Sequence, residues 1–166
     1  MRFTTLMYLL GMFLVLLGER MIGGEDTWRW GLDALGVLCL LGVLFRLGQQ
    51  VKIGVSENNT GRAQSHKLAL LFALIGTSSL GVYALSTGWG MDLMGHDLLS
   101  GNQEEADAAE RYWVVTTCLW LILWLVGTLP FVAADWVLNR NPMAVDASAT
   151  RKVVLSTLAM SLLLSA

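Results

Sequence analysis

One carboxylate of this chain falls inside an apolar stretch long enough to cross a membrane. Asp33 lies one turn after Trp30, at the start of the run 30–48. An acidic side chain inside a bilayer is costly and often belongs to an ion or proton pathway. No Lys, Arg or His is expected at mid-membrane to complete such a relay, and Asp33 is close enough to the interface to reach water. We therefore treat Asp33 as a candidate functional carboxylate and expect a structural or shallowly hydrated role for it.

Small side chains recur at every fourth position along the apolar run 68–85. They are Ala69, Ala73, Thr77 and Gly81. This spacing places them on one face of a helix and allows a second helix to approach closely. Two interpretations remain open: the face contacts a neighbouring subunit, or it packs against other helices of this chain.

Residues that could bind a metal or a haem are few and scattered. Asp92, His96 and Asp97 are close in sequence, but their spacing matches no metal-binding motif, and we expect an ordinary solvated loop there. His66 and His96 are expected at opposite membrane faces, so they cannot ligate one haem together. The sequence therefore predicts no metal, no cofactor and no catalytic residue.

Two further pairs of residues have mainly structural interpretations. Cys39 and Cys118 lie in separate apolar runs, which is typical of buried small hydrophobic side chains and not of a disulfide framework. Trp120 and Trp124 lie one turn apart in the fourth apolar run. We expect this pair to pack or to face lipid, although a ligand-stacking site is the alternative.

The elements that would position these residues are membrane helices. The chain is 55% hydrophobic and 14% charged, whereas about 25% charged residues is typical of a soluble domain. A helix needs about 20 apolar residues to cross the hydrocarbon core, and four runs qualify while a fifth covers only about 21 Å. The expected spans are residues 3–22, 30–48, 68–85 and 112–138, with an incomplete span at 153–166.

These spans predict an all-α, polytopic transmembrane helical bundle that forms a single domain over residues 1–166. The incomplete last span predicts that the native chain continues into an extracytoplasmic part. Long loops are expected at 49–67 and 86–111, and the second half of the latter, Gln103 to Arg111, is expected to continue helically into the fourth span. Pro130 predicts a kink in that span.

The basic residues are distributed unevenly across this predicted topology. Eight of the 11 Lys and Arg residues fall on one side of the membrane, and 10 of the 13 acids fall on the other. The eight are Arg2, Arg46, Lys52, Arg62, Lys67, Arg140, Arg151 and Lys152. Basic residues in short loops favour the cytoplasmic side, so we expect a cytoplasmic N-terminus in a bacterial inner (plasma) membrane. The net charge of −2 gives no basic surface for nucleic acid.

The end of the chain resembles a known membrane anchor. The segment Asp146-Ala-Ser-Ala-Thr-Arg151-Lys152 leads into an apolar helix rich in Ala, Ser and Leu. This is similar to the anchor of gliding-motility-type auxiliary proteins of ABC transporters (the GldG-like family). The resemblance covers about 20 residues and carries over no catalytic or binding residue. It implies an anchor that precedes a large extracytoplasmic domain.

The leading hypothesis is a non-enzymatic integral membrane subunit or anchor of a larger complex, in an ABC-transporter-associated assembly if the resemblance holds. Its expected partners are the lipid bilayer, other membrane subunits or further copies of itself, and an extracytoplasmic partner. The first alternative is a small transporter or channel subunit that uses Asp33 and a kink at Pro130. The second alternative is a membrane subunit of a quinone or redox complex, with Trp120 and Trp124 near a pocket.

Overall fold

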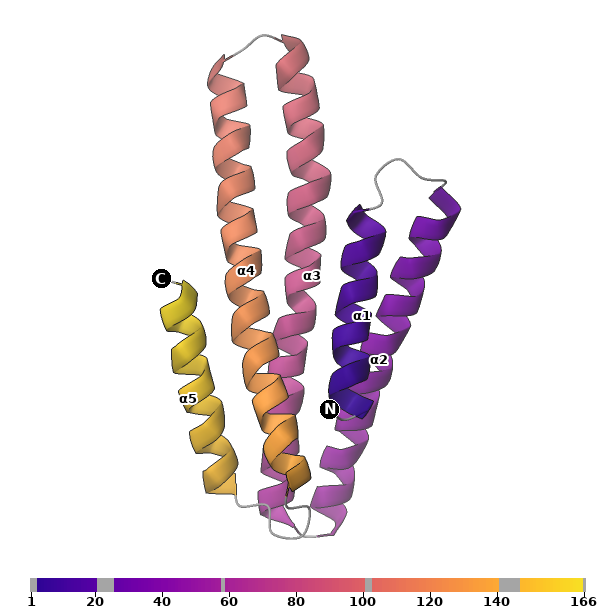
Figure 1. Ribbon diagram of the computed structural model, residues 1–166, viewed down its shortest axis with the longest axis vertical. Helices are drawn as coiled ribbons and strands as arrows, with labels where there is room; N and C mark the ends of the chain where they lie inside the picture. Colours follow the sequence, from indigo (N-terminus) through magenta and orange to yellow (C-terminus); the bar gives the residue numbers. More distant parts are fainter. Residues whose placement is uncertain (1–2, 21–25, 58, 101–102, 141–146, 166) are drawn as a thin grey trace.

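The described residues fold into five helices, which confirms the all-α prediction for this part of the chain. The computed structural model describes the backbone of residues 3–20, 26–57, 59–100, 103–140 and 147–165. In chain order the helices are α1 (Phe3–Arg20), α2 (Asp26–Ser56), α3 (Thr60–Ser100), α4 (Gln103–Arg140) and α5 (Ala147–Ser165). They run side by side along the long axis of the molecule (Figure 1).

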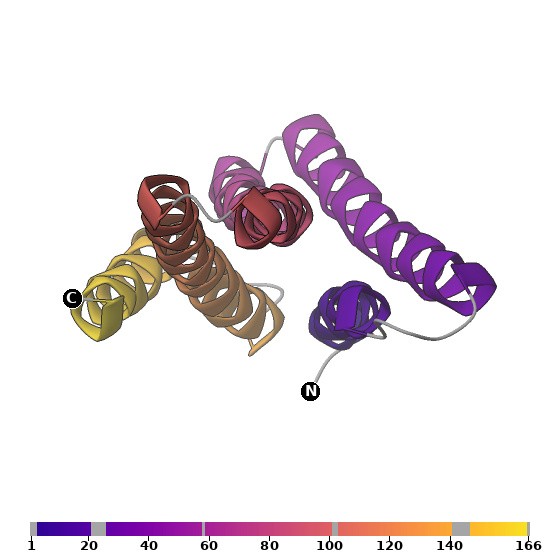
Figure 2. The same cartoon turned by 90° about the horizontal axis from the view of Figure 1, so that it is seen from above.

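Four of the helices follow one another across the bundle, and the fifth lies against one side of them. Helix α3 packs most extensively against α4, α5 packs on α4, and α2 packs on α3. Helix α1 packs mainly on α2 and also contacts α3 and α4. Seen from above, α2 and α5 lie at opposite edges of the molecule (Figure 2). Each of these two helices therefore has a broad surface that no other described helix of the chain covers.

Three helices are long and apolar enough to cross a membrane, which indicates a membrane protein. The candidate spans are Trp30–Ser56 in α2, Thr60–Ala84 in α3 and Glu110–Leu138 in α4. The apolar part of α1, Phe3–Gly18, is shorter than these three. Most of each candidate span is not buried within the chain, as expected for helices whose outer surface faces lipid.

The helices are longer than the apolar runs that predict them. Helix α2 continues to Ser56 and α3 begins at Thr60, so the expected loop 49–67 was wrong for most of its length. Likewise, α3 continues to Ser100, although a loop was expected from residue 86. At the α2–α3 connection, Gln, Lys, Arg and Ala occur among residues 49–67. These are good helix formers, which allows the two helices to continue past the apolar runs. The predicted helical start of α4 at Gln103 is confirmed.

A side-chain cap begins α3 directly after the short connection from α2. The amide of Arg62 donates a hydrogen bond to Oδ1 of Asn59 at 3.1 Å. Asn59 thereby satisfies one of the free amides in the first turn of the helix, as a typical N-cap residue does. Gly54 permits the tight connection, because a Cβ at this position would lie 3.1 Å from both the N and Cα atoms of Ala63.

Glycine pairs allow the closest approaches between helices. A Cβ at Gly127 of α4 would lie 2.1 Å from the nitrogen and 2.4 Å from the Cα of Gly76 of α3. On the other side of the bundle, a Cβ at Gly36 of α2 would lie 2.8 Å from the carbonyl oxygen of Gly11 in α1. Small residues at such crossings let helix backbones pack closely in a membrane. The α3–α4 crossing therefore holds the centre of the bundle closed.

Large side chains pack around the α3–α4 crossing and form the core. Tyr8 of α1 and Phe131 of α4 are fully buried, and their ring centroids are 4.5 Å apart. The Tyr8 hydroxyl reaches α3, because a Cβ at Gly76 would lie 2.0 Å from it. Helix α1 is thus held against both α3 and α4 at the level of their closest contact.

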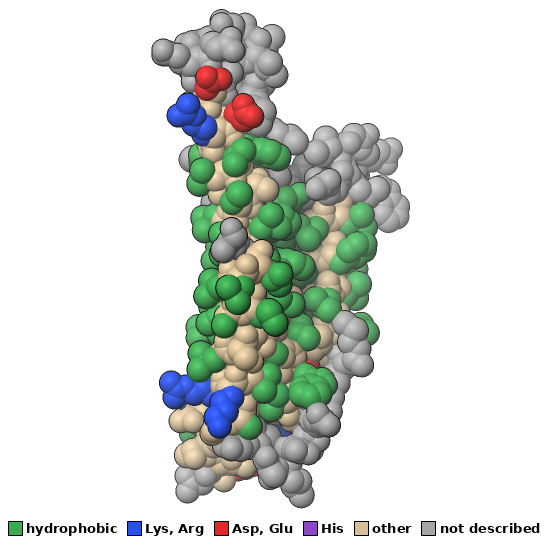
Figure 3. Space-filling model, turned by 60° about the vertical axis from the view of Figure 1, so that its left-hand side comes forward, with side chains coloured by type: hydrophobic (Ala, Val, Ile, Leu, Met, Phe, Trp, Pro, Cys, Tyr) green, Lys and Arg blue, Asp and Glu red, His purple; other side chains and the backbone are tan. Residues whose placement is uncertain are grey.

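Charged side chains lie at the two ends of the molecule, and an apolar belt lies between them (Figure 3). One end is formed by the C-terminal ends of α2 and α4 and the N-terminal ends of α3 and α5. The described basic side chains near this end, which we call the basic end, are Arg46, Lys52, Arg62, Lys67, Arg151 and Lys152. Asp107, Glu110 and Arg111 lie toward the opposite end, in the first turns of α4.

Candidate functional site

A polar pocket lies at the basic end, where four helices converge. It has a volume of about 210 Å³. Helix α1 contributes Thr4, α2 contributes Arg46 and Gln50, and α3 contributes Arg62 and His66. Helix α4 completes the lining with Asp135 and Leu138. Such a gathering of charged and polar side chains at the end of a helical bundle is a candidate binding site.

Asp135 is the most buried charged residue of this pocket. It is 5% exposed and accepts a hydrogen bond from the hydroxyl of Thr5, also 5% exposed, across the α1–α4 contact. It lies within the candidate span Glu110–Leu138, on the same face of α4 as Phe131 and Leu138. A carboxylate at such a position is costly unless it is paired, so the Thr5–Asp135 contact stabilises the junction of α1 with α4.

The first turns of α3 position His66 toward the pocket. Its ring nitrogen Nδ1 donates a hydrogen bond to the carbonyl oxygen of Arg62, at 2.9 Å. This hydrogen bond fixes the orientation of the imidazole ring. The other ring nitrogen, Nε2, takes no part in it. The neighbouring residue, Ser65, is fully buried and donates a hydrogen bond to Thr150 of α5 at 3.0 Å. Thus α5 is held against α3 at the level of the pocket.

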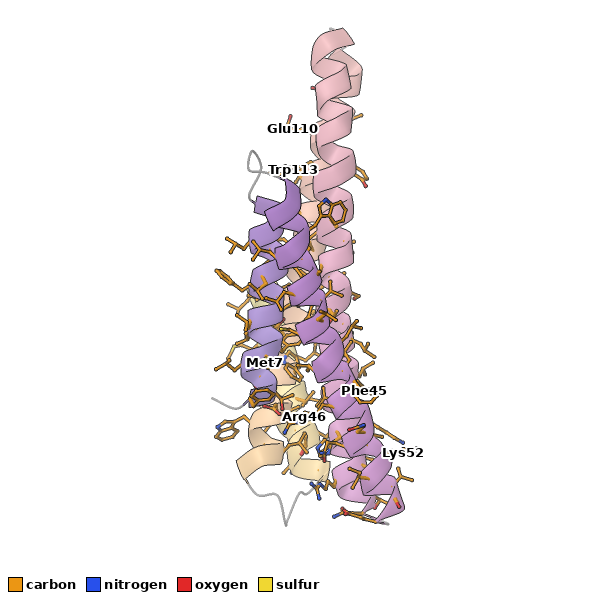
Figure 4. All side chains as sticks on the ribbon, turned by 90° about the vertical axis from the view of Figure 1, so that its right-hand side faces the viewer. Met7, Phe45, Arg46, Lys52, Glu110 and Trp113 are labelled. Carbon is orange, nitrogen blue, oxygen red and sulfur yellow. The ribbon has the colours of Figure 1, made fainter. Side chains whose placement is uncertain are left out.

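Two guanidinium groups border the pocket from neighbouring helices. Arg46 lies over the ring of Phe3, with 5.5 Å between its Cζ atom and the ring centroid, within the range of a cation–π contact. Arg62 forms an ion pair with Glu57 at 3.7 Å, and both side chains are partly exposed. Figure 4 shows Arg46 below Met7 where α1 meets α2, and Lys52 further toward the basic end.

An apolar groove adjoins the polar pocket between α1 and α2. Its volume is about 320 Å³, and it is lined by Met7 of α1 and by Leu38, Gly42 and Val43 of α2. Thr4 and Arg46 line both the groove and the polar pocket. The two cavities are therefore neighbours: one is lined mainly by polar side chains and the other mainly by apolar ones, and Thr4 and Arg46 lie between them.

The described residues support binding better than metal or redox chemistry. Among them there is no group of three His, Cys, Asp or Glu side chains that could hold a metal ion. Asp92, His96 and Asp97 lie outside the residues whose side chains are described. The Trp120 ring packs against Tyr83, with centroids 4.8 Å apart, and Trp124 packs against the core. Arg46, Arg62 and His66 instead provide donors for a polar, anionic group.

The carboxylate singled out by the sequence lies far from this pocket. Asp33 is half-buried near the start of α2 and within the candidate span Trp30–Ser56. The 13 residues that separate it from Arg46 correspond to about 20 Å along the helix. The structure therefore does not bring Asp33 together with the charged residues of the pocket.

The small residues of α3 divide into a buried part and an exposed part. Ala69 and Ala73 are fully buried in the core of this chain. Thr77 is half-buried, and its hydroxyl donates to the carbonyl oxygen of Ala73 at 2.8 Å. Gly81 is exposed, and a Cβ there would meet no atom within 4 Å. Gly76, which the every-fourth-residue pattern omits, makes the closest approach to α4.

Asp135 was not singled out from the sequence. It lies inside the candidate span Glu110–Leu138 and is buried, so Asp33 is not the one carboxylate within a candidate span. The signal was present in the spacing: Asp135 follows Phe131 by four residues and precedes Leu138 by three, so all three share a helix face. Cys118, expected to be buried, is exposed on α4, and Cys39 is half-buried beside the groove.

The whole chain was compared with known proteins. No protein-family model, no curated protein and no solved structure matches the chain. The functional proposals therefore rest on the charges, contacts and dimensions described above.

Proposed function

We propose that this chain is a non-enzymatic integral membrane subunit or anchor of a larger complex. It crosses the bacterial inner membrane four times through α1 to α4, with a cytoplasmic N-terminus. The uneven charge distribution supports this topology: Arg46, Lys52 and the basic residues of α3 and α5 gather at one end. Because basic residues favour the cytoplasmic side, we place the basic end in the cytoplasm.

The observation that carries this proposal is the excess length of the α3–α4 hairpin. Helix α3 has 41 residues and α4 has 38, so each is close to 60 Å long, about twice the thickness of the hydrocarbon core. The hairpin extends past the ends of α1 and α2 opposite the basic end (Figure 1). Its projecting part is covered by no other described helix of the chain.

A projecting two-helix hairpin has little surface of its own to bury. Most helical stability in proteins comes from the packing of a helix against other elements, and among the described helices the projecting turns of α3 lie beside those of α4 alone (Figure 1). Of the described side chains near this end, the exposed acids Asp107 and Glu110 outnumber the one exposed basic residue, Arg111. We therefore propose that the hairpin docks on an extracytoplasmic partner, with which it would complete its packing. The GldG-like resemblance suggests an ABC-transporter-associated assembly as one setting.

The closed centre of the bundle favours this role over transport. A transporter that used Asp33 and Pro130 would need a polar route between Asp33 and the basic end. The described residues between them include the Gly76–Gly127 crossing and the fully buried rings of Tyr8 and Phe131. The redox alternative would use the indoles of Trp120 and Trp124 around a ligand, but these indoles contact Tyr83 and the core.

Affinity purification from a mild detergent tests the subunit role. We expect the tagged chain to copurify with a partner in a fixed stoichiometry, in a particle heavier than the 18.2 kDa chain. Reversing the hairpin charges with Asp107→Lys and Glu110→Lys should reduce the recovered partner about tenfold, since charge reversal opposes electrostatic complementarity. The matched control reverses Arg151 and Lys152 to Glu at the opposite end, and it should leave recovery unchanged.

Two results would count against the proposal. One is a monodisperse, partnerless monomer from cells that express the wild-type chain at its natural level. The other is equal loss of partner in the two charge-reversal pairs, which would indicate a general effect of charge on the membrane protein instead of docking by the hairpin.

A further inference from the structure

The polar pocket and the apolar groove have the dimensions and polarity of a site for an amphiphile. The pocket of about 210 Å³ holds the charges, and the groove of about 320 Å³ is lined mainly by apolar side chains. Thr4 and Arg46 stand at the junction of the two. A ligand that fills both must therefore have a charged head next to an alkyl chain.

A missing side chain leaves room for the alkyl chain. Gly42 lies in the wall of the groove, and a Cβ built there meets no atom within 4 Å. Leu38 and Val43 line the groove beside it and supply apolar contact surface. The groove thus has open space where any other residue of α2 would project a side chain.

The pocket lies at the depth where lipid headgroups are found. Trp136, next to Asp135 in α4, is 56% exposed, and tryptophan prefers the membrane–water interface. The hydrogen bond between Ser65 and Thr150 places the start of α5 at the same level. Arg151 and Lys152 follow directly and are exposed. The level of the pocket is therefore marked by an interfacial aromatic residue and by further basic side chains.

The charges of the pocket select an anionic head. Arg46 and Arg62 contribute two positive charges, and the one carboxylate, Asp135, already accepts a hydrogen bond from Thr5. The described lining residues thus carry one net positive charge, which favours an anionic group such as a phosphodiester. Arginine binds phosphate oxygens through paired donors, and basic pockets between membrane helices on the cytoplasmic side are suited to anionic lipid heads. The Arg62–Glu57 pair is partly exposed and therefore weak.

We propose that this site binds one anionic phospholipid. Its phosphodiester lies between Arg46 and Arg62, and one of its acyl chains follows the groove over Gly42. Gln50 and His66 supply further polar contacts to the head. This inference does not depend on the subunit role, because the binding is measured on the purified chain alone.

Lipid retention on the purified protein tests this proposal. The delipidated chain in detergent micelles is mixed with equal amounts of phosphatidylglycerol and phosphatidylcholine, and the retained lipid is identified by native mass spectrometry. We expect one phosphatidylglycerol per chain, in at least about tenfold preference, since only its net charge matches the pocket. Arg46→Ala should weaken this binding about tenfold through the loss of a charge-assisted contact.

Two glycines of α2 provide a matched pair of variants for the alkyl chain. Gly42→Leu fills the groove and should reduce phosphatidylglycerol retention about tenfold. Gly48→Leu makes the same change on the same helix, also at a position with no atom within 4 Å of the added Cβ and outside the groove lining. It should leave retention unchanged. At neither position does a Cβ meet another atom within 4 Å, and the helix content of both variants, measured by circular dichroism, should equal that of the wild-type chain.

Three outcomes would overturn the proposal. Equal retention of phosphatidylcholine would show that the charges do not select the head. Equal effects of Gly42→Leu and Gly48→Leu would remove the groove from the site. Displacement of the lipid by millimolar inorganic phosphate, with no contribution from the alkyl chain, would indicate a site for a small anion only.

Discussion

Replacing Gly127 with Ala is expected to destabilise the bundle by about 3 kcal/mol or more, at the upper end of the range for overpacking. The added Cβ would lie 2.1 Å from the nitrogen and 2.4 Å from the Cα of Gly76. Both atoms belong to the backbone of α3, so no side-chain rotation can relieve the overlap. The helices must separate, and the packing of Tyr8 and Phe131 around their crossing must loosen. The free energy of unfolding in mixed micelles, followed by tryptophan fluorescence, measures this cost.

The matched control is the same substitution at an open position of the other helix. Gly81→Ala adds a Cβ that meets no atom within 4 Å, so its effect should stay within about 1 kcal/mol, the usual difference between the two residues in a helix. Equal unfolding free energies for the two variants would mean that the α3–α4 crossing does not determine the stability of the bundle.

Removal of the hydroxyl that contacts Asp135 is expected to have the second largest effect. Thr5→Val keeps the shape of the side chain but takes a hydrogen-bond donor from a carboxylate that is 5% exposed. Hydrogen bonds to charged groups contribute about 1.5–3 kcal/mol, and the loss of this one should lower the free energy of unfolding by that amount. With Asp135→Asn already present, the same substitution should cost only about 0.5–1.5 kcal/mol, the range for a neutral pair.

The difference between these two costs is the coupling energy of the Thr5–Asp135 contact. Thr116→Val serves as the control, because the Thr116 hydroxyl bonds to the carbonyl oxygens of Tyr112 and Trp113 in its own helix. Its cost should not depend on residue 135. If Thr5→Val had the same cost with Asp or Asn at position 135, the contact would not be what stabilises the α1–α4 junction.

The apolar runs of the sequence predict where most of the helices lie but not where they end. Hydrophobicity reports how much of a helix can enter a membrane, whereas backbone hydrogen bonding continues into water wherever the residues favour a helix. Residues 49–56 are of mixed polarity and residues 60–67 are mostly polar, yet both segments are helical, so the connection between α2 and α3 is far shorter than expected. Asn59, whose side chain caps α3, is a local signal for this boundary that hydrophobicity does not detect.

The site was harder to predict because its residues come from four helices. Arg46, Arg62 and His66 each look like ordinary residues near the end of a membrane helix. The packing of α2 on α3 and of α3 on α4 brings them to one pocket with Asp135. Small-residue spacing likewise predicts a packing face on α3, but the closest approach is at Gly76, whose partner Gly127 is visible only once the helices are paired.

Labelling of single cysteines from outside intact cells tests the proposed topology most directly, and the proposal that the hairpin docks on an extracytoplasmic partner depends on it. With Cys39 and Cys118 replaced by Ser, Asp107→Cys and Lys152→Cys each provide one exposed thiol at opposite ends of the bundle. We predict that a membrane-impermeant maleimide modifies residue 107 in intact cells and residue 152 only after the membrane is opened. The reverse pattern, or labelling of both residues in intact cells, would contradict a bundle that spans the membrane with its basic end in the cytoplasm.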